Sequence, residues 1–175
     1  MVFLELSGDG RDLGVLSLDE LSSQPLLTSA FYERNAALSP DGRWLAYQSN
    51  ESGQDEIYVQ PFPNVNDGRW PISRDGGTRP LWAPDGREFF YLSLGGELMA
   101  VRTQTGQSFV PGNAQVILRG PKFTPANYVW RSYDISPDGK RFLTILESSG
   151  ETARAELNLV LNWFEELERL VPTEP

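Results

Sequence analysis

The chain has 175 residues and a formal net charge of −9, and this acidity disfavours nucleic-acid binding because that function needs a basic surface. Aromatic residues make up 11% of the sequence, too many for an intrinsically disordered chain. The complete lack of Cys and His excludes disulfides, a thiol nucleophile, Cys-ligated metal and a Ser-His-Asp triad, so an enzyme would depend on carboxylate, Tyr, Lys or Ser chemistry.

Three short strands are expected at the N-terminus, at residues 2–6, 12–18 and 24–28. A Gly8-Asp9-Gly10 turn separates the first two. The run before this turn is too short, and with Glu5 too acidic, for the apolar core of a secretory signal. Because the sequence also has no run of about 18 apolar residues, we expect no membrane insertion and a cytoplasmic location for the chain as encoded.

One tetrapeptide recurs three times along the rest of the chain. Residues 39–42 and 136–139 read Ser-Pro-Asp-Gly and residues 83–86 read Ala-Pro-Asp-Gly, at spacings of 44 and 53 residues. Pro presets the second position of a type I turn, Asp suits the third, and Gly adopts the left-handed backbone that turns the chain back. Each tetrapeptide is therefore expected to join the two strands of a hairpin.

Each predicted hairpin begins a repeating unit. The expected strands are residues 35–38, 44–49, 56–60 and 69–73, then 79–82, 88–93, 97–102 and 114–118, then 132–135, 141–146 and 157–161. Four antiparallel strands in a unit of about 40–50 residues are typical of β-propeller blades.

The predicted fold class is all-β, about half a β-propeller ring with two full and two partial blades. The expected boundaries are a partial blade at 1–30, full blades at 31–75 and 76–120, and a partial blade at 121–164. Apolar residues at helical spacing near the C-terminus predict a short helix in the tail at 165–175, ended by Pro172.

The recurring turn, the basic residue near it and the apolar strand after it resemble the TolB-like (WD40-like) β-propeller repeat family. Residues 38–63, 76–91, 133–142 and 160–170 carry the resemblance, in particular to the C-terminal propeller part of bacterial sensor-type serine/threonine kinases. It implies radial blades that bind proteins or small ligands at loops and at a central channel, without catalysis. In a membrane sensor protein of that kind, the chain would lie outside the cytoplasm.

Two groups of residues are candidate metal ligands or catalytic carboxylates: the turn residues Asp41, Asp85 and Asp138, and the loop residues Asn50, Glu51, Asp55 and Glu56. We expect each turn aspartate to stabilise its own turn by local hydrogen bonds. The loop lacks the alternating oxygen ligands of a calcium loop, so we expect a solvated hairpin turn. No metal or cofactor is predicted.

The segment 121–131 is the stretch least like the repeat and accounts for the longer spacing of 53 residues. Loops on a rigid scaffold often carry function, so we expect a partner-contact loop with the residues Lys122, Tyr128, Trp130 and Arg131. The other tryptophans divide into expected core residues, Trp44, Trp82 and Trp163, and one further surface candidate, Trp70.

A propeller normally closes with about 4–8 blades, so this chain would leave two open ends. Two copies could close one ring, the chain could belong to a longer protein, or the sheets could form an open stack; we expect the first. The predicted function is a non-catalytic module for protein–protein interaction or ligand sensing, with a homodimer or another protein as partner. The alternative is a carboxylate-based lyase or glycoside hydrolase, which needs two acids about 5–9 Å apart in the channel.

Overall fold

The computed structural model describes residues 1–7, 10–105, 108–119 and 131–144. These residues form antiparallel strands and one short 3₁₀ turn, η1 (Val65–Asp67), which confirms the predicted all-β class. No helix within these ranges has the length and apolar character needed to cross a bilayer. The expected strand at 157–161 and the helical tail at 165–175 lie outside the described residues.

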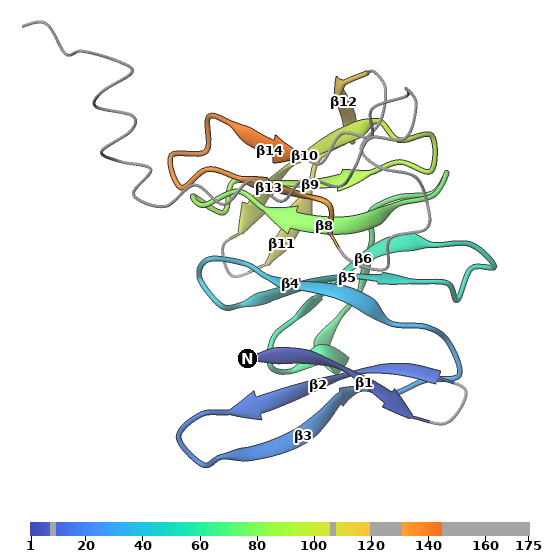
Figure 1. Cartoon of the computed structure of the whole chain (residues 1–175), viewed down its shortest axis with the longest axis vertical. Coiled ribbons are helices and arrows are strands. Elements are labelled where there is room, and N and C mark those ends of the chain that lie inside the picture. The colour runs from blue at the N-terminus through green and yellow to red at the C-terminus, as the bar shows by residue number, and fades with distance from the viewer. Residues whose placement is uncertain (8–9, 106–107, 120–130, 145–175) are drawn as a thin grey trace, which may run out of the picture.

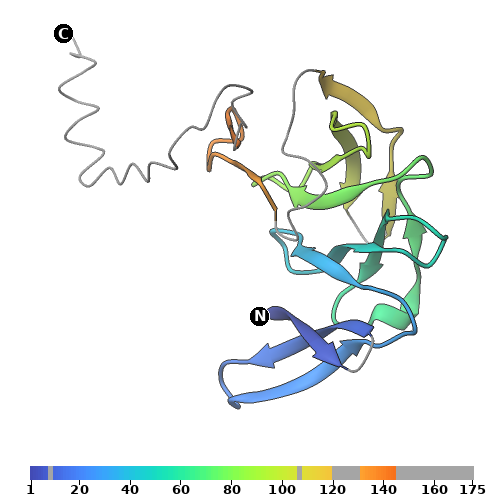
Figure 2. The same cartoon turned by 45° about the vertical axis from the view of Figure 1, so that its right-hand side comes forward.

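Four antiparallel sheets follow one another in chain order (Figure 1). The first contains β1 (Val2–Ser7), β2 (Gly10–Ser17) and β3 (Ser22–Leu27). The second contains β4 (Arg34–Leu38), β5 (Trp44–Ser49), β6 (Glu56–Pro61) and β7 (Trp70–Pro71). The third contains β8 (Thr78–Trp82), β9 (Glu88–Leu92), β10 (Leu98–Thr105), β11 (Phe109–Pro111) and β12 (Gln115–Leu118), and the fourth contains β13 (Tyr133–Ile135) and β14 (Phe142–Thr144). Together the sheets describe an arc whose concave side carries the first strand of each repeat (Figure 2).

The recurring tetrapeptide forms the predicted turn each time. The amide of Gly42 donates to the carbonyl of Ser39 at 2.8 Å, and Gly86 and Gly139 make the equivalent bonds. All three glycines have φ of 69–70°, where a residue with a Cβ is strained. Each turn therefore fixes a hairpin between the first and second strand of its unit, as the sequence predicts.

The outer strand of the third sheet is split, which the sequence pattern did not predict. β10 pairs with β12 through Leu98–Ala100 and with β11 through Thr103–Thr105. Between them, Gly112 donates its amide to the carbonyl of Arg102 at 2.8 Å, and a Cβ at this glycine would lie 3.1 Å from that oxygen. β11 has only three residues and ends in a proline, so Phe109 and Val110 give a strand signal too short to stand out.

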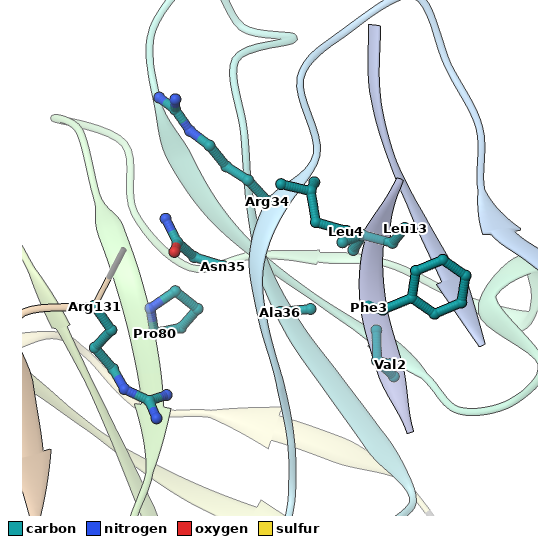
Figure 3. Close-up of a pocket in the computed structure, with 9 residues that line it drawn as sticks. All are labelled: Val2, Phe3, Leu4, Leu13, Arg34, Asn35, Ala36, Pro80 and Arg131. Atoms are coloured by element: carbon teal, nitrogen blue, oxygen red, sulfur yellow. The ribbon is translucent and has the colours of Figure 1, made fainter. Parts of the chain in front are cut away.

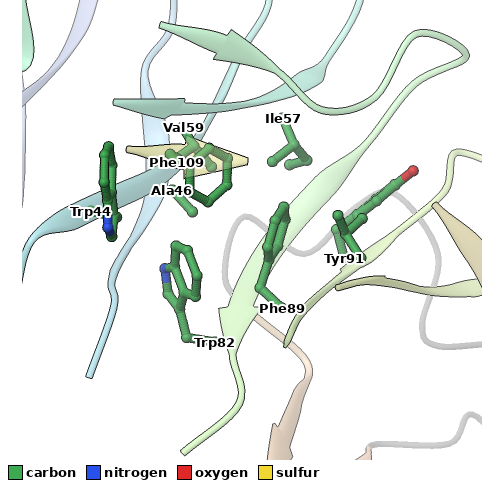
Figure 4. Packing of buried hydrophobic residues seen from close by; sticks show 9 residues of the cluster. Trp44, Ala46, Ile57, Val59, Trp82, Phe89, Tyr91 and Phe109 are labelled. Carbon is green, nitrogen blue, oxygen red and sulfur yellow. The ribbon is translucent and has the colours of Figure 1, made fainter. Parts of the chain in front are cut away.

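The largest apolar cluster lies between the second and third sheets (Figure 4). The rings of Trp44, Trp82 and Phe89 are almost fully buried there, and Phe109 of β11 packs within 5.2 Å of Trp44, measured between ring centroids. The core prediction for Trp44 and Trp82 is confirmed, whereas Trp163 lies outside the described residues. The surface prediction for Trp70 is wrong, because its half-buried ring packs edge-on against Trp44 and Phe109.

Candidate functional site

The first strand of each unit lies on the concave side of the arc, and corresponding positions of the repeat meet there. Arg34 and Arg131 each precede the serine of their turn by the same number of residues, and Thr78 is the equivalent residue in the middle unit. Directly after two of these positions the strand bulges, because Asn35 and Arg79 have φ of 53° and 57° and the pairing register shifts. The bulge is thus a shared feature of β4 and β8.

A hollow of about 310 Å³ opens beside these strands (Figure 3). Its described lining is apolar except for two arginines and one amide: Val2, Phe3, Leu4, Leu13, Arg34, Asn35, Ala36, Pro80 and Arg131. Three different sheets and the segment just before β13 contribute these residues. The combination of an apolar wall with a few convergent polar groups is typical of binding sites.

Positive charge predominates at the hollow. Arg34 pairs with Asp55, with 2.6 Å between Nη2 and Oδ2, while the buried Nε of Arg34 has no hydrogen-bond partner among the described residues. Burial lowers the pKa of the neighbouring Arg79, and the charge of Arg34 lowers it further. Because the lining includes Arg131 and no carboxylate, the site is suited to an anionic group.

Hydrogen bonds within the second sheet and between neighbouring sheets hold the inner strands in place. The Oε1 atom of the buried Gln48 accepts from Nδ2 of Asn35 at 2.9 Å and from the amide of Arg79 at 3.3 Å. The hydroxyl of Tyr133 donates to the carbonyl of Arg79 at 2.7 Å. Burial raises the pKa of Tyr133, so the hydroxyl keeps its proton and remains a donor. The backbone of the second bulge is therefore fixed from both sides.

Of the four residues predicted for the partner-contact loop, only Arg131 lies within the described residues, and it lines the hollow. Lys122, Tyr128 and Trp130 lie outside them, so the contact loop stays a prediction. Sequence reasoning missed Arg34 and Asn35. The signal for Arg34 is its position, which is the same position of the repeat as that of Arg131.

The acidic candidates have local partners. The Oδ1 atoms of Asp41, Asp85 and Asp138 each accept from the main-chain amide two residues later, at 3.0–3.2 Å, which confirms their role in the turns. The hydrogen bonds from Ser136 and from that amide also hold the pKa of Asp138 below its usual value.

The acidic loop fastens neighbouring elements together. Asn50 accepts from the amide of Tyr32 at 2.8 Å, Glu51 pairs with Arg69, and Asp55 pairs with Arg34. The buried Glu56 accepts from Ser73 and, at 3.0 Å, from the amide of Gly76. Glu56 is therefore an internal tie between β6 and the segment before β8, and not part of a solvated turn as expected.

A second buried acid, Glu33, lies just before β4 and was not singled out in the sequence. Its Oε1 accepts from Ser29 at 2.7 Å and from Ser49 at 3.4 Å, whereas its buried Oε2 has no partner among the described residues. Burial raises the pKa of Glu33, and the charge of Asp12 raises it further. These two acids are 4% and 9% exposed and do not line the hollow.

No protein-family model and no curated protein matches the chain. Among solved structures, it is similar to TolB from Acinetobacter baumannii, with a TM-score of 0.61 and 17% identity over 86% of this chain and 35% of that one. It is also similar to a structure described as putative TolB from Agrobacterium tumefaciens, with a TM-score of 0.53 and 17% identity over 82% of this chain and 55% of that one.

The chain thus spans about a third to a half of these two proteins. An oligogalacturonate lyase from Vibrio parahaemolyticus aligns with a TM-score of 0.43 and 20% identity, over 67% of this chain and 30% of the lyase. This TM-score is too low for a functional comparison. The repeated turns, the arc of antiparallel sheets and the two closer similarities agree: the chain has the TolB-like β-propeller fold.

Proposed function

We propose that this chain is a non-catalytic β-propeller module that binds an acidic segment of another protein, or a smaller carboxylate-bearing ligand, at the hollow on its concave side. The observation that supports this most directly is the placement of Arg34 and Arg131 over an apolar lining. Burying apolar groups supplies affinity, and a charge-assisted hydrogen bond from a guanidinium to a carboxylate supplies selectivity.

The lining also supports a binding role in preference to catalysis. Its described side chains are aliphatic, aromatic, amide or guanidinium groups, none of which serves as a nucleophile or general base near neutral pH. The alternative of a lyase or glycoside hydrolase requires two acids facing the substrate. Asp12 and Glu33 are near each other and one has a raised pKa, but both are buried away from the lining, so they do not favour that alternative.

Selectivity for charge tests the proposal. A panel of labelled peptides of equal length, graded from acidic to basic, would be titrated with the full chain and followed by fluorescence anisotropy. We expect the acidic peptides to bind more tightly, and Arg131→Gln to weaken them about tenfold, the effect of losing one charged hydrogen bond. The matched control is Arg87→Gln, because Arg87 is an exposed arginine outside the hollow. Equal binding of acidic and basic peptides, or equal losses in the two variants, would reject the proposed site.

We further propose that a second copy of the chain closes the ring. The support is the arc itself, which leaves the first and fourth sheets without a neighbour on their outer sides among the described residues. Such open faces promote association. Size-exclusion chromatography with light scattering is the test, and a dimer mass is expected. A monomer mass at every concentration would reject ring closure by a second copy while leaving the binding proposal intact.

A further inference from the structure

β1 presents an unpaired edge toward the concave side of the arc. In the first sheet the order is β1-β2-β3, so no described strand pairs with the other side of β1. Met1 and Leu16 exchange both main-chain hydrogen bonds, at 2.7 and 2.8 Å. Since bonding pairs alternate along an antiparallel ladder, the N–H and C=O groups of Val2, Leu4 and Leu6 point away from β2 and toward this edge.

In the second sheet, the corresponding side of β5 is occupied by β4. Phe62 donates to the carbonyl of Arg43, which places the main-chain groups of the next residue, Trp44, on the side away from β6. There the carbonyl of Trp44 accepts from Ser39 at 2.8 Å, and β4 pairs along β5. Where β5 pairs with β4, β1 has no described partner.

Burial shows the same difference. Leu45 and Ala46 of β5 are 0% exposed beneath β4. Counted back from the last pair of each hairpin, Ser7 with Gly10 and Ser49 with Glu56, the corresponding residues of β1 are Phe3 and Leu4, and both are only half-buried. Both Phe3 and Leu4 also line the hollow. The space beside β1 is therefore where the repeat would place one more inner strand.

We propose that β1 takes up an extended, acidic segment of a partner protein as an added antiparallel strand. This inference rests on the proposed function, because it concerns the same hollow, and it specifies how the partner binds. The new ladder would use the main-chain groups of Val2, Leu4 and Leu6, as in other cases of strand addition to an open sheet edge.

The side chains of the added strand follow from the lining. Residues on one face of a strand alternate with those on the other, so the face turned toward Leu13 and Ala36 would be apolar. A position that reaches Arg131 would carry Asp or Glu, because the described lining has no carboxylate, whereas Arg34 already pairs with Asp55. Charge complementarity thus favours an acidic partner over a neutral or basic one.

The probe is a synthetic peptide with the sequence of residues 132–139, Ser-Tyr-Asp-Ile-Ser-Pro-Asp-Gly, an inner strand and turn of this repeat that contains two aspartates. Binding to the full chain would be followed by amide hydrogen exchange. We expect exchange at Leu4 and Leu6 to slow about tenfold or more when the peptide is added, because these amides gain partners. A copy of the peptide with N-methyl groups on alternate amides has the same side chains and charge, and we expect it to bind about tenfold more weakly.

A matched pair of variants tests the edge from the side of the protein. Leu4→Pro removes the N–H that points to the open edge without removing a bond to β2, whereas Leu4→Ala shortens the side chain and keeps the N–H. We expect Leu4→Pro to bind the peptide about tenfold more weakly than Leu4→Ala. If Leu4→Pro does not fold, the N-methylated peptide still decides the question.

The outcomes separate the two proposals. Binding that depends on Arg131 but is indifferent to N-methylation and to Leu4→Pro would overturn strand addition and leave the proposed function standing. Failure of the peptide to slow exchange at Leu4 and Leu6 would also overturn strand addition, while the graded peptide panel decides the function independently. If the chain is a dimer that dissociates in Leu4→Pro, a second copy occupies the edge, and the inference of a separate partner is wrong.

Discussion

The hairpin β1–β2 of the first sheet and the hairpin β5–β6 of the second correspond when their positions are counted back from the last pair of each, but the two sheets differ in how they are covered. β5 lies between β4 and β6, and its residues Leu45 and Ala46 are fully buried. Within the part of the chain that the structure describes, β1 has a paired strand on one side only, and the corresponding Phe3 and Leu4 remain half-buried. Leu4 lies on the face of β1 that packs toward the second sheet, and Phe3 lies on the opposite face, which no described sheet covers. The exposure of β1 therefore has two causes among the described residues: an edge without a paired strand and an outer face without a neighbouring sheet. The strand addition proposed at β1 depends on the first of these causes.

The largest effect is expected where cover is complete, between the second and third sheets. Phe89 is 0% exposed and its ring lies 5.1 Å from that of Trp82, measured between centroids. Phe89→Ala should lower the free energy of unfolding by about 3–5 kcal/mol, because it removes buried apolar area and leaves a cavity. Urea denaturation measures this loss. Leu143→Ala is the control, since Leu143 is 76% exposed, and a similar loss in both variants would contradict the packing described.

A matched pair of truncations tests the comparison itself. Leu45→Ala should cost about 2–5 kcal/mol, the range for a buried leucine. Phe3→Ala removes a larger side chain from the equivalent position of β1, but we expect a loss of only about 1–2 kcal/mol, because the ring is half-buried. Both losses are measured from the shift of the urea midpoint, with the m-value unchanged between the variants. If Phe3→Ala costs more than Leu45→Ala, β1 is better covered than the structure shows.

The fold could be predicted from the sequence because its strongest signals are local. The Pro-Asp-Gly turns need specific backbone angles at Gly42, Gly86 and Gly139, and the apolar runs beside them have strand periodicity. The split outer strand could not be predicted in this way, because it depends on the close approach of Gly112 to the main chain of Arg102. No local sequence pattern indicates that contact.

The candidate site was harder to predict because it is formed between repeats. Arg131 was identified from its place in an atypical segment, but the hollow needs β1 and β4 as well. Trp70 was misplaced for a related reason: it lies near a loop, and its partners Trp44 and Phe109 come from different sheets. Spacing within one unit shows which residues share a strand, but not which sheets meet face to face.

A smaller effect is expected from the hydrogen bond that joins the third and fourth sheets. Tyr133 is 4% exposed, and its hydroxyl donates to the carbonyl of Arg79 at 2.7 Å. Tyr133→Phe keeps the ring and removes only this donor, so we expect a loss of about 1–2 kcal/mol, measured by thermal or urea unfolding. Slower exchange at the bulge in the variant than in the unaltered chain would contradict the role assigned to this bond.

The smallest expected effect is on how the free energy of unfolding changes with pH, and it concerns Glu33, which lies where the first two sheets meet. Burial raises the pKa of Glu33 above its usual value of 4.5, and Asp12 adds to the shift. The folded chain therefore holds a proton on Glu33 at pH values where the unfolded chain has released it. The stabilisation is present below about pH 4.5 and is lost as the pH rises through the raised pKa of the folded state.

Urea midpoints compared between the unaltered chain and Glu33→Gln from acid to neutral pH measure this effect. Because glutamine does not titrate, the stability of the unaltered chain should fall relative to the variant as the pH rises through that window. Asp138→Asn is a useful contrast, since the pKa of Asp138 is lowered and an exposed turn residue should give a weak effect of opposite sign. A flat difference for Glu33→Gln would mean that Glu33 is as well solvated in the folded chain as in the unfolded one, and that the first sheet does not cover it.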